Sequence, residues 1–449
     1  MTTSQPPGPR LSTVGALRAI RRDPIALLER AASFGDVSHV RLPRVSLYLL
    51  NRPDLARDVL VDHHRDVRKG PTMDAARRVL GESLLTSEGE HHMRQRRLIQ
   101  PMFHHERVEA YGASMVELAE RAAARWSDGG PLDVHAEMAR LTLAIVGRTI
   151  FDVDVEAEHA REVAGALDET LAQFNRALSP FLRFTERLPL PANRRFQRAR
   201  GVFDRMIHGM IAERRKAGLE GGDLLSLLLR AREGGSGMTD EQVRDEAVTL
   251  FLAGHETTSN ALTWTWYVLG EHPSIRAELE AELDDVLDGR APSVADVRRL
   301  TFTDAVLKEA MRCYPPAWAI GRRLLADHEA DGYVLPAGSV LVVSPWLLHH
   351  DRRWWEEPAA FRPERWIDAE TERPRHAYLP FGAGPRMCVG EEFARLEAVL
   401  LLATIAARWR FEHDPGHRVE LQPVITLRPR TGMPMTARRR APHRAHGAA

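Results

Sequence analysis

The sequence contains few cysteines and few lysines, and it carries no net charge. Two cysteines, Cys313 and Cys388, are too few for a disulfide framework in 449 residues and favour a reducing compartment. The 62 basic and 62 acidic side chains balance, which argues against a protein that binds nucleic acid or an anionic membrane. Lysine occurs only at positions 69, 216 and 308, so arginine supplies nearly all of the positive charge, a bias that suggests a GC-rich bacterial genome.

The sequence also lacks a long apolar run. Its first ten residues, MTTSQPPGPR, contain no apolar segment of the kind that signal peptides have. The longest apolar-rich stretch, AVLLLATIAA from Ala398, is much shorter than the ~20 residues that a membrane span needs. We therefore expect a bacterial protein of the cytoplasm that has no stable membrane anchor and that acts as a monomer.

Most of the sequence has the 3.6-residue periodicity of helices, and strand signals are few. Helices are expected over 106–126, 134–150, 197–217 and 274–288. Strands are expected over 37–50, as a hairpin that turns near Pro43, over 333–343 and over 424–436. Because no long linker divides the chain, we expect one mainly α domain with a small β region over 20–437. A flexible segment would precede it at 1–19, and a basic, disordered tail would follow at 438–449.

One expected helix is unusually long and has a polar middle. It begins at Thr239, where Gln242 completes a capping box, and continues to about Gly270, a length of ~46 Å. Its central sequence AGHETTSNA consists largely of weak helix formers. A polar, poorly helical segment inside a buried helix is costly, which favours a functional site; the alternative is a packing defect that tertiary contacts tolerate.

The segment FGAGPRMCVG, residues 381–390, is a glycine-rich loop that leads into an apolar helix. Cys388 stands just before this helix, where free backbone N–H groups favour a thiolate. Such a position suits a ligand for a soft metal ion, although most single cysteines are small buried hydrophobic residues. Cys313 fits this second description. A zinc site is not expected, because His255 and Glu256 are not followed by the second histidine of an HExxH motif.

Four motifs in order along the chain resemble those of the cytochrome P450 family of haem-thiolate monooxygenases. Phe381, Gly384, Arg386, Cys388 and Gly390 match the haem-binding loop. The sequence AGHETT, from Ala253 to Thr258, resembles the oxygen-activating central helix. EAMR, from Glu309 to Arg312, resembles the Glu-x-x-Arg motif, and FRPERW, from Phe361 to Trp366, resembles the segment that completes it. The resemblance covers about 20–437, nearly the whole chain.

The resemblance implies the cytochrome P450 fold, with the long central helix over a buried haem b. Cys388 would ligate the iron, and Phe381, Arg386 and Gly390 would surround it in the loop. His92, Arg96, Arg322 and Arg386 would hold the haem propionates; many relatives have tryptophan at the position of His92, but histidine can also donate. The choice of Arg322 over Arg323 depends on its spacing to Asp327 and Gly332.

The resemblance also assigns roles on the central helix and beside it. Ala253, Gly254 and Thr258 would line the oxygen pocket, where Gly254 leaves room for oxygen. Glu256 and Thr257 would relay protons for the activation of dioxygen. Glu309 and Arg312 lie on one helical face and can pair, and Arg365 would complete a structural triad that fixes the segment before the cysteine loop. The alternative is a solvated surface pair.

We therefore predict a haem-dependent monooxygenase that hydroxylates, or oxidises further, a small apolar molecule. Residues 70–88 and 165–190, with Phe174, Leu178, Phe181, Leu182 and Phe184, would contact that substrate. Chain length and the AGHETT form resemble bacterial terpenoid oxidases of secondary metabolism. Two alternatives are an enzyme that uses or rearranges peroxides and a non-catalytic haem protein that binds ligands; the Glu256–Thr257 pair argues against both.

The sequence contains no motif for a nicotinamide or flavin cofactor of its own, neither GxGxxG nor a P-loop. Electrons would therefore come from a separate ferredoxin and its reductase. The arginines Arg94, Arg97 and Arg107 could form the surface on which an acidic ferredoxin docks.

Overall fold

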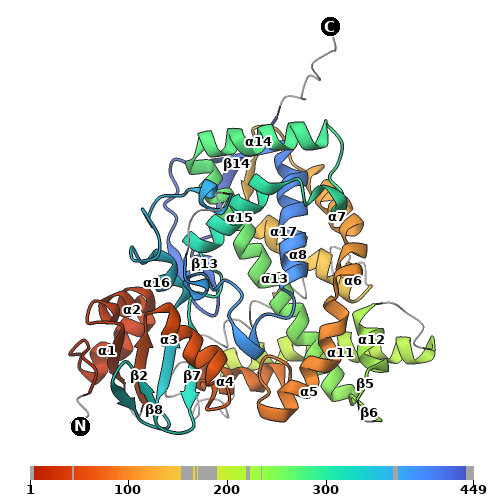
Figure 1. Ribbon diagram of the computed structural model, residues 1–449. Coiled ribbons are helices and arrows are strands. Elements are labelled where there is room, and N and C mark those ends of the chain that lie inside the picture. The colour runs from red at the N-terminus through yellow and green to blue at the C-terminus, as the bar shows by residue number, and fades with distance from the viewer. Residues whose placement is uncertain are drawn as a thin grey trace.

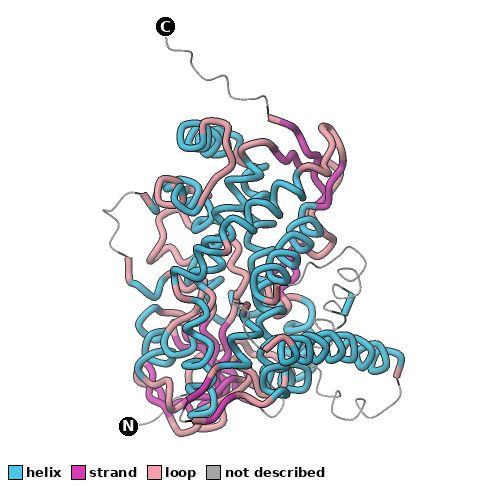
Figure 2. The backbone as a smooth tube through the Cα atoms, turned by 90° about the vertical axis from the view of Figure 1, so that its right-hand side faces the viewer, coloured by secondary structure: helices cyan, strands magenta, loops and turns pink. Residues whose placement is uncertain are grey.

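The structure of the chain is a computed structural model. The structure describes residues 5–42, 45–152, 165–166, 169, 190–218, 223–233, 235–367 and 373–440. Helices form most of the body, and a sheet with short helices around it lies at the end that contains the N-terminus (Figure 1). Turning the molecule by 90° shows most strands gathered at two places, near the N-terminus and at the opposite end (Figure 2). This is the mainly α architecture with a small β region that the sequence predicts.

The helices begin and end as follows: α1 Thr13–Arg22, α2 Pro24–Ala32, α3 Pro53–Arg57, α4 Pro71–Leu80, α5 Gly89–Ile99, α6 His105–Ala110, α7 Gly112–Ala123, α8 Val134–Ile150, α11 Pro191–Lys216, α12 Leu224–Arg230, α13 Asp240–Glu271, α14 Pro273–Leu287, α15 Thr301–Cys313, α16 Pro345–His350 and α17 Glu391–Ala406. None of these helices is both long and apolar enough to cross a membrane, as far as the chain is described. The boundaries expected for the domain stay a prediction: α1 already begins at Thr13, and the last strand reaches Arg439.

The strands are β1 Val37–Leu42, β2 Val45–Leu50, β3 Val67–Lys69, β4 Pro131–Asp133, β5 Arg232–Glu233, β6 Ser236–Gly237, β7 Ile320–Leu324, β8 His328–Ala330, β9 Tyr333–Leu335, β10 Val340–Val343, β11 Trp409–His413, β12 Leu421–Pro423, β13 Leu427–Pro429 and β14 Pro434–Arg439. Five of them form the largest sheet, in the order β1-β2-β10-β7-β3. Only β10 and β2 run parallel; the other neighbours in this sheet are antiparallel. A three-stranded sheet has the order β11-β14-β4, and β12 and β13 form a hairpin.

Helix α13 passes through the middle of the molecule (Figure 1). It begins as the sequence predicts: the Thr239 hydroxyl accepts from the Gln242 N–H, and the Gln242 side chain accepts from the Thr239 N–H. Its 32 residues are buried along most of their length, and α8, α11, α15 and α17 pack around it in the main hydrophobic core. A polar segment within this helix is therefore placed at the centre of the fold.

The expected helices and strands are present, with three differences. The range 424–436 contains β13 and the start of β14, which belong to different sheets because residues 430–433 between them form a turn in which Gly432 has φ +76°. The range 106–126 is divided between α6 and α7, because Tyr111 ends the first helix and precedes the second. The range 333–343 contains β9 and β10, which belong to different sheets because Pro336 and Gly338, with φ +80°, form a turn between them. The predicted hairpin over 37–50 corresponds to β1 and β2; its turn at 43–44 lies outside the described residues.

Candidate active site

Cys388 lies in a tight loop that leads directly into α17. The Cys388 N–H donates to the Phe381 carbonyl at 3.0 Å, which closes the loop. Gly384 has φ +70°, and a Cβ atom at this position would lie 2.1 Å from the Leu60 carbonyl oxygen. The close packing of the loop therefore requires glycine here. Gly390, the N-cap residue of α17, directs its backbone N–H at the Cys388 sulfur.

The surroundings of the sulfur have opposite effects on its ionisation. Burial raises the pKa of the Cys388 thiol, whereas the Gly390 N–H and the charge of Arg96 lower it. The start of the helix alone therefore does not ionise this cysteine. The Cys388 side chain is nevertheless accessible, although it lies deep in the protein, so it faces an internal space. A thiolate in this position needs a cation beside it, and a soft metal ion that binds sulfur meets that need.

Five nitrogen-bearing side chains lie close together near this cysteine. They are Lys69 of β3, His92 and Arg96 of α5, Arg322 of β7 and Arg386 of the cysteine loop. Lys69 and Arg322 stand opposite each other in the β3–β7 ladder. Arg96 donates to the Met387 carbonyl at 2.7 Å. Arg386 donates to the Ser87 carbonyl at 2.8 Å and forms an ion pair with Glu88. We call these five residues the cation cluster.

The members of the cation cluster disfavour one another's charges. Burial and then the charge of Arg386 lower the pKa of Lys69 well below its usual value and the pKa of Arg322 to about 10. Burial and the same neighbours lower the pKa of His92 to about 3, so its ring is neutral near pH 7. Among the described residues, Glu88 is the acid in ion-pair contact with the cluster. The cluster is short of negative charge, and a buried dianion would relieve this shortage.

These donors fit a haem group. Its two propionates would meet the cation cluster, and its iron would meet the Cys388 sulfur. The structure therefore brings together His92, Arg96, Arg322, Arg386 and Cys388, as the sequence predicts, whereas Arg323 has a more exposed side chain 3.7 Å from Asp74. Lys69 is a member of the cluster that the sequence motifs do not predict. The feature of the sequence that could have marked Lys69 is the rarity of lysine, because nearly all other basic residues are arginine. The structure shows that this lysine is also buried.

One face of α13 is accessible, although the rest of the helix is buried. Ala253 is exposed and Gly254 and Thr257 are half-buried, whereas both flanking turns are buried. An accessible face in the middle of a buried helix shows that an internal space adjoins it. Gly254 also permits close packing, because a Cβ atom there would lie 3.1 Å from Cγ2 of Val146 in α8. Its expected role of leaving room for oxygen stays a prediction. Thr258, by contrast, is buried.

Glu256 and Thr257 make different contacts. The Thr257 hydroxyl donates to the Ala253 carbonyl at 2.8 Å, a bond that threonine often makes within a helix. Glu256 is buried, and its Oε1 accepts from the Thr426 hydroxyl at 2.7 Å and from Nδ2 of Asn260 at 3.4 Å. Thr426 could not be predicted from the sequence, because no local pattern connects Glu256 to a residue 170 positions further along the chain.

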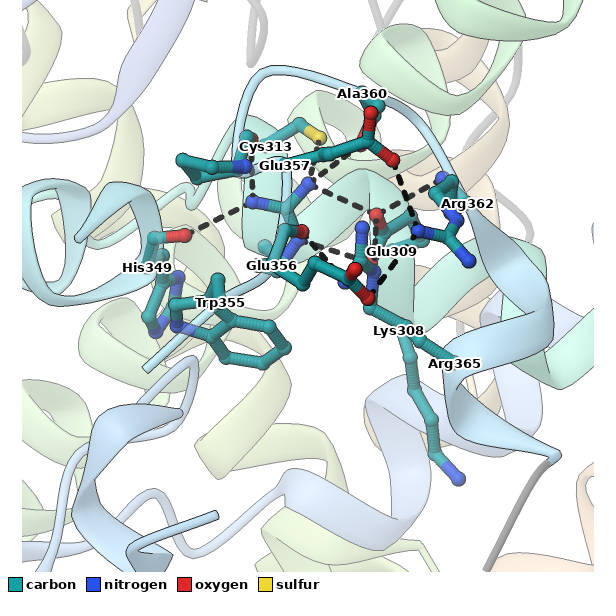
Figure 3. A network of polar contacts seen from close by, with 12 residues as sticks. Lys308, Glu309, Cys313, His349, Trp355, Glu356, Glu357, Ala360, Arg362 and Arg365 are labelled. Carbon is teal, nitrogen blue, oxygen red and sulfur yellow. Dashed lines mark hydrogen bonds and ion pairs between the residues drawn. The ribbon is translucent and has the colours of Figure 1, made fainter. Parts of the chain in front are cut away.

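The structure also brings Glu309, Arg312 and Arg365 together, and Figure 3 shows Glu309 and Arg365 within this network. Arg312 donates to both oxygens of Glu309, at 2.9 and 2.8 Å, and Nε of Arg365 donates to Oε1 at 3.0 Å. Two further donors, which the sequence motifs do not predict, are the Trp366 indole, at 2.8 Å, and the Arg362 backbone N–H, at 3.0 Å. The solvated surface pair is excluded, because Glu309 and Arg312 are fully buried.

Arg312 connects this group to the chain that precedes the cysteine loop. Its guanidinium also donates to the carbonyls of His349, Pro358 and Ala360, at 2.9, 2.8 and 3.0 Å. Further along, the Leu379 N–H donates to Nε2 of His349 at 2.9 Å. These bonds fix an irregular segment that has little secondary structure to hold it, as expected of a structural triad.

An accessible cysteine that faces an internal space beside buried cations is the arrangement that a thiolate-ligated haem requires. Fold and site thus define a haem-thiolate protein of mainly α structure. A sequence profile of the family described as Cytochrome P450 matches residues 6–433. The chain belongs to the cytochrome P450 family.

Three curated relatives match nearly the whole chain. "Cyclooctat-9-en-7-ol 5-monooxygenase" of Streptomyces melanosporofaciens is 38% identical and covers 92% of this chain and 91% of its own. "Cyclooctatin synthase" of the same organism is also 38% identical, over 95% and 96%. "Pentalenene oxygenase" of Streptomyces avermitilis is 35% identical, over 92% and 91%. The family membership and these relatives confirm that the protein is a monooxygenase, and that its cofactor is a haem with a cysteine thiolate as axial ligand.

Proposed function

We propose that the protein hydroxylates a small apolar terpenoid intermediate of secondary metabolism. The relatives named above are the main support for this proposal. They match the chain over nearly its full length, and two of their names specify the oxidation of such molecules. Apolar residues near the expected site agree with it: Ala253 is exposed on α13, and Met73, Leu84 and Leu85 in the range 70–88 are partly buried. The five expected contact residues between 174 and 184 lie outside the described residues.

The substrate class can be tested by titrating the purified haem protein with candidate ligands and recording the Soret band. We expect pentalenene or cyclooctat-9-en-7-ol to shift the band at micromolar concentration. Fatty acids and macrolides of similar mass serve as controls. A strong shift with a fatty acid or macrolide and none with the terpenoids would contradict the proposed substrate class and leave the monooxygenase assignment intact.

Proton delivery is the part of the reaction that this chain's residues perform. When bound, the haem supplies the oxidising chemistry, because thiolate ligation favours cleavage of the O–O bond. In a monooxygenase, one oxygen atom enters the product and the other leaves as water, which consumes two electrons and two protons. Thr257 would donate protons at the accessible face of α13, and Glu256, its neighbour in sequence, would resupply them.

The two roles predict different defects. Thr257→Ala is expected to keep haem and ligand binding and to divert reductant toward hydrogen peroxide. Glu256→Gln is expected to slow oxygen consumption overall, because the resupply of protons becomes limiting. Product formed and peroxide released per reductant oxidised are the measurements. If Thr257→Ala forms as much product per reductant as the wild type, its proposed role is wrong.

The electrons would come from a separate ferredoxin that docks near Cys388. Met387, the residue before Cys388, is 36% exposed. Arg97 of α5 and Arg107 of α6 are exposed as well. Arg94 is half-buried, so the more exposed Arg97 and Arg107 support the docking proposal better.

The dependence on a partner can be tested by reconstitution. We expect turnover with a ferredoxin and its reductase, and we expect it to weaken with salt as the Debye length falls to ~3 Å at 1 M. Arg97→Glu should raise the ferredoxin concentration needed for half-maximal rate, whereas Arg121→Glu, at an exposed side chain of α7, serves as a charge-matched control. Turnover with peroxide alone, at the rate of the complete system, would instead support the peroxide-using alternative.

A further inference from the structure

Glu256 belongs to a buried group of three polar side chains. Thr426 and Asn260 are 5% and 1% exposed. The Thr426 hydroxyl donates to Oε1 of Glu256 at 2.7 Å. Asn260, one helical turn after Glu256, donates through Nδ2 to the Thr426 hydroxyl oxygen at 3.1 Å and more weakly to Oε1 of Glu256 at 3.4 Å. Thr426 thus makes the shortest of these contacts with the carboxylate.

The backbone around Thr426 is held independently of its hydroxyl. Thr426 lies in the turn of the β12–β13 hairpin. On one side the Trp318 indole donates to the Val424 carbonyl at 2.9 Å, and on the other side the Trp264 indole donates to the Leu427 carbonyl at 2.9 Å. The turn therefore has fixed anchors next to Thr426. The Thr426 hydroxyl is therefore not needed to hold the hairpin in place. Its specific contribution is the hydrogen bond to the Glu256 carboxylate.

We propose that Thr426 is a positioning residue for proton delivery, which orients the Glu256 carboxylate by donating to its Oε1. This inference rests on the proposed function of Glu256 as the group that resupplies protons. A carboxylate on three rotatable bonds samples many orientations unless hydrogen bonds select one. The bond from a fixed turn selects an orientation in which Oε1 is engaged, so that Oε2 remains for the exchange of protons. Only protons move, and Thr426 itself gains and loses none.

Thr426→Val removes the hydroxyl at nearly constant volume, and Thr426→Ser retains it. The matched control is Thr265→Val, because Thr265 is fully buried on the same helix and its hydroxyl donates within that helix, to the Ala261 carbonyl at 2.7 Å. Each variant is first checked for the Soret band of thiolate ligation with carbon monoxide. Oxygen consumption and its solvent isotope effect are then measured with ferredoxin and reductase, with cyclooctat-9-en-7-ol and without substrate, since oxygen reduction consumes protons in both cases.

We expect Thr426→Val to slow oxygen consumption about tenfold, the effect of one lost hydrogen bond to a charged group, and to raise the solvent isotope effect. Thr426→Ser should restore both, and Thr265→Val should match the wild type. The double variant with Glu256→Gln should be no slower than Glu256→Gln alone. If Thr426→Val loses its haem, Thr426→Ala takes its place.

The results separate this inference from the proposed function. If Glu256→Gln is slow and Thr426→Val is as fast as the wild type, the positioning role of Thr426 is wrong and the role of Glu256 stands. If both variants are as fast as the wild type, the role of Glu256 itself is wrong. Equal slowing by Thr426→Val with and without Glu256→Gln would show that the hydroxyl acts elsewhere, which would also overturn the inference.

Discussion

Replacing Glu309 by glutamine should destabilise the protein more than any exposed substitution nearby. The Glu309 carboxylate is fully buried and accepts five hydrogen bonds, from Arg312, Arg365, Trp366 and the Arg362 backbone. Glutamine keeps the shape but removes the charge, and its NH₂ group faces donors. The guanidinium groups of Arg312 and Arg365 then lack their counter-charge. Breaking a buried ion pair in this way lowers the free energy of unfolding by ~3–5 kcal/mol.

This loss converts to a measurable shift in the unfolding midpoint. With an unfolding entropy of ~2.1 cal/mol/K per residue, the 449 residues give ~0.9 kcal/mol/K. The midpoint of Glu309→Gln should therefore lie about 3–5 °C below that of the wild type. Trp366→Phe removes one hydrogen bond to the carboxylate, worth ~1.5–3 kcal/mol, and should cause a smaller shift.

The assay is thermal unfolding of the haem protein, followed by circular dichroism and by the Soret band. Glu356→Gln is the control, because Glu356 is 83% exposed and lies 3.6 Å from Arg362 in the same region. Its effect should stay below ~0.5 kcal/mol. A Glu309→Gln protein that unfolds within 1 °C of the wild type, or a control that shifts equally, would show that the buried charge is not what holds this region together.

Three further predictions concern the site. Cys388→Ala should lose the carbon-monoxide Soret band of thiolate ligation, whereas Cys313→Ala, at a buried cysteine, should keep it; the opposite result would exchange their roles. Lys69→Met should release haem faster to an excess of apomyoglobin, because a donor of the cation cluster is lost; an unchanged rate would remove Lys69 from the haem site. Burial raises the pKa of Glu246 from 4.5 to about 8, so the folded protein keeps a proton that the unfolded chain releases. The free energy of unfolding should therefore fall between about pH 4.5 and 8, by at most ~1.4 kcal/mol per pH unit. Glu246→Gln should flatten this slope in denaturant titrations, and an unaltered slope would refute the assignment.

The parts of the site that could be predicted from sequence are those that local spacing defines. Glu309 and Arg312 are three positions apart on a helix, so their pairing follows from helical geometry. The capping box at Thr239 is equally local, and the structure contains both. Arg365 needed the family resemblance, because 56 positions separate it from Glu309 and no periodicity connects them.

The parts that could not be predicted depend on how distant segments pack. Lys69 reaches the cation cluster because β3 pairs with β7, more than 250 positions later, which no local pattern announces. Trp366 belongs to the FRPERW motif, but the hydrogen bond from its indole to Glu309 becomes visible only in the folded structure. Thr426 meets Glu256 through a hairpin whose placement is set by two tryptophan indoles. The sequence therefore predicts which chemical groups each motif contributes, whereas the tertiary structure determines which residues those groups contact.

The turn between α4 and α5, residues 81–88, connects the cation cluster to the central helix. It has little secondary structure, so side chains must satisfy its buried backbone groups. The partners are Asp245 and Glu246 of α13 for the N–H groups of Glu82 and Leu84, and Lys69, Arg77 and Arg386 for the carbonyls of Leu85, Thr86 and Ser87. Two members of the cation cluster thus also shape a loop expected to contact substrate. Because Lys69 and Arg386 each contribute to both, the geometry of the substrate loop and the electrostatics of the haem site cannot vary independently.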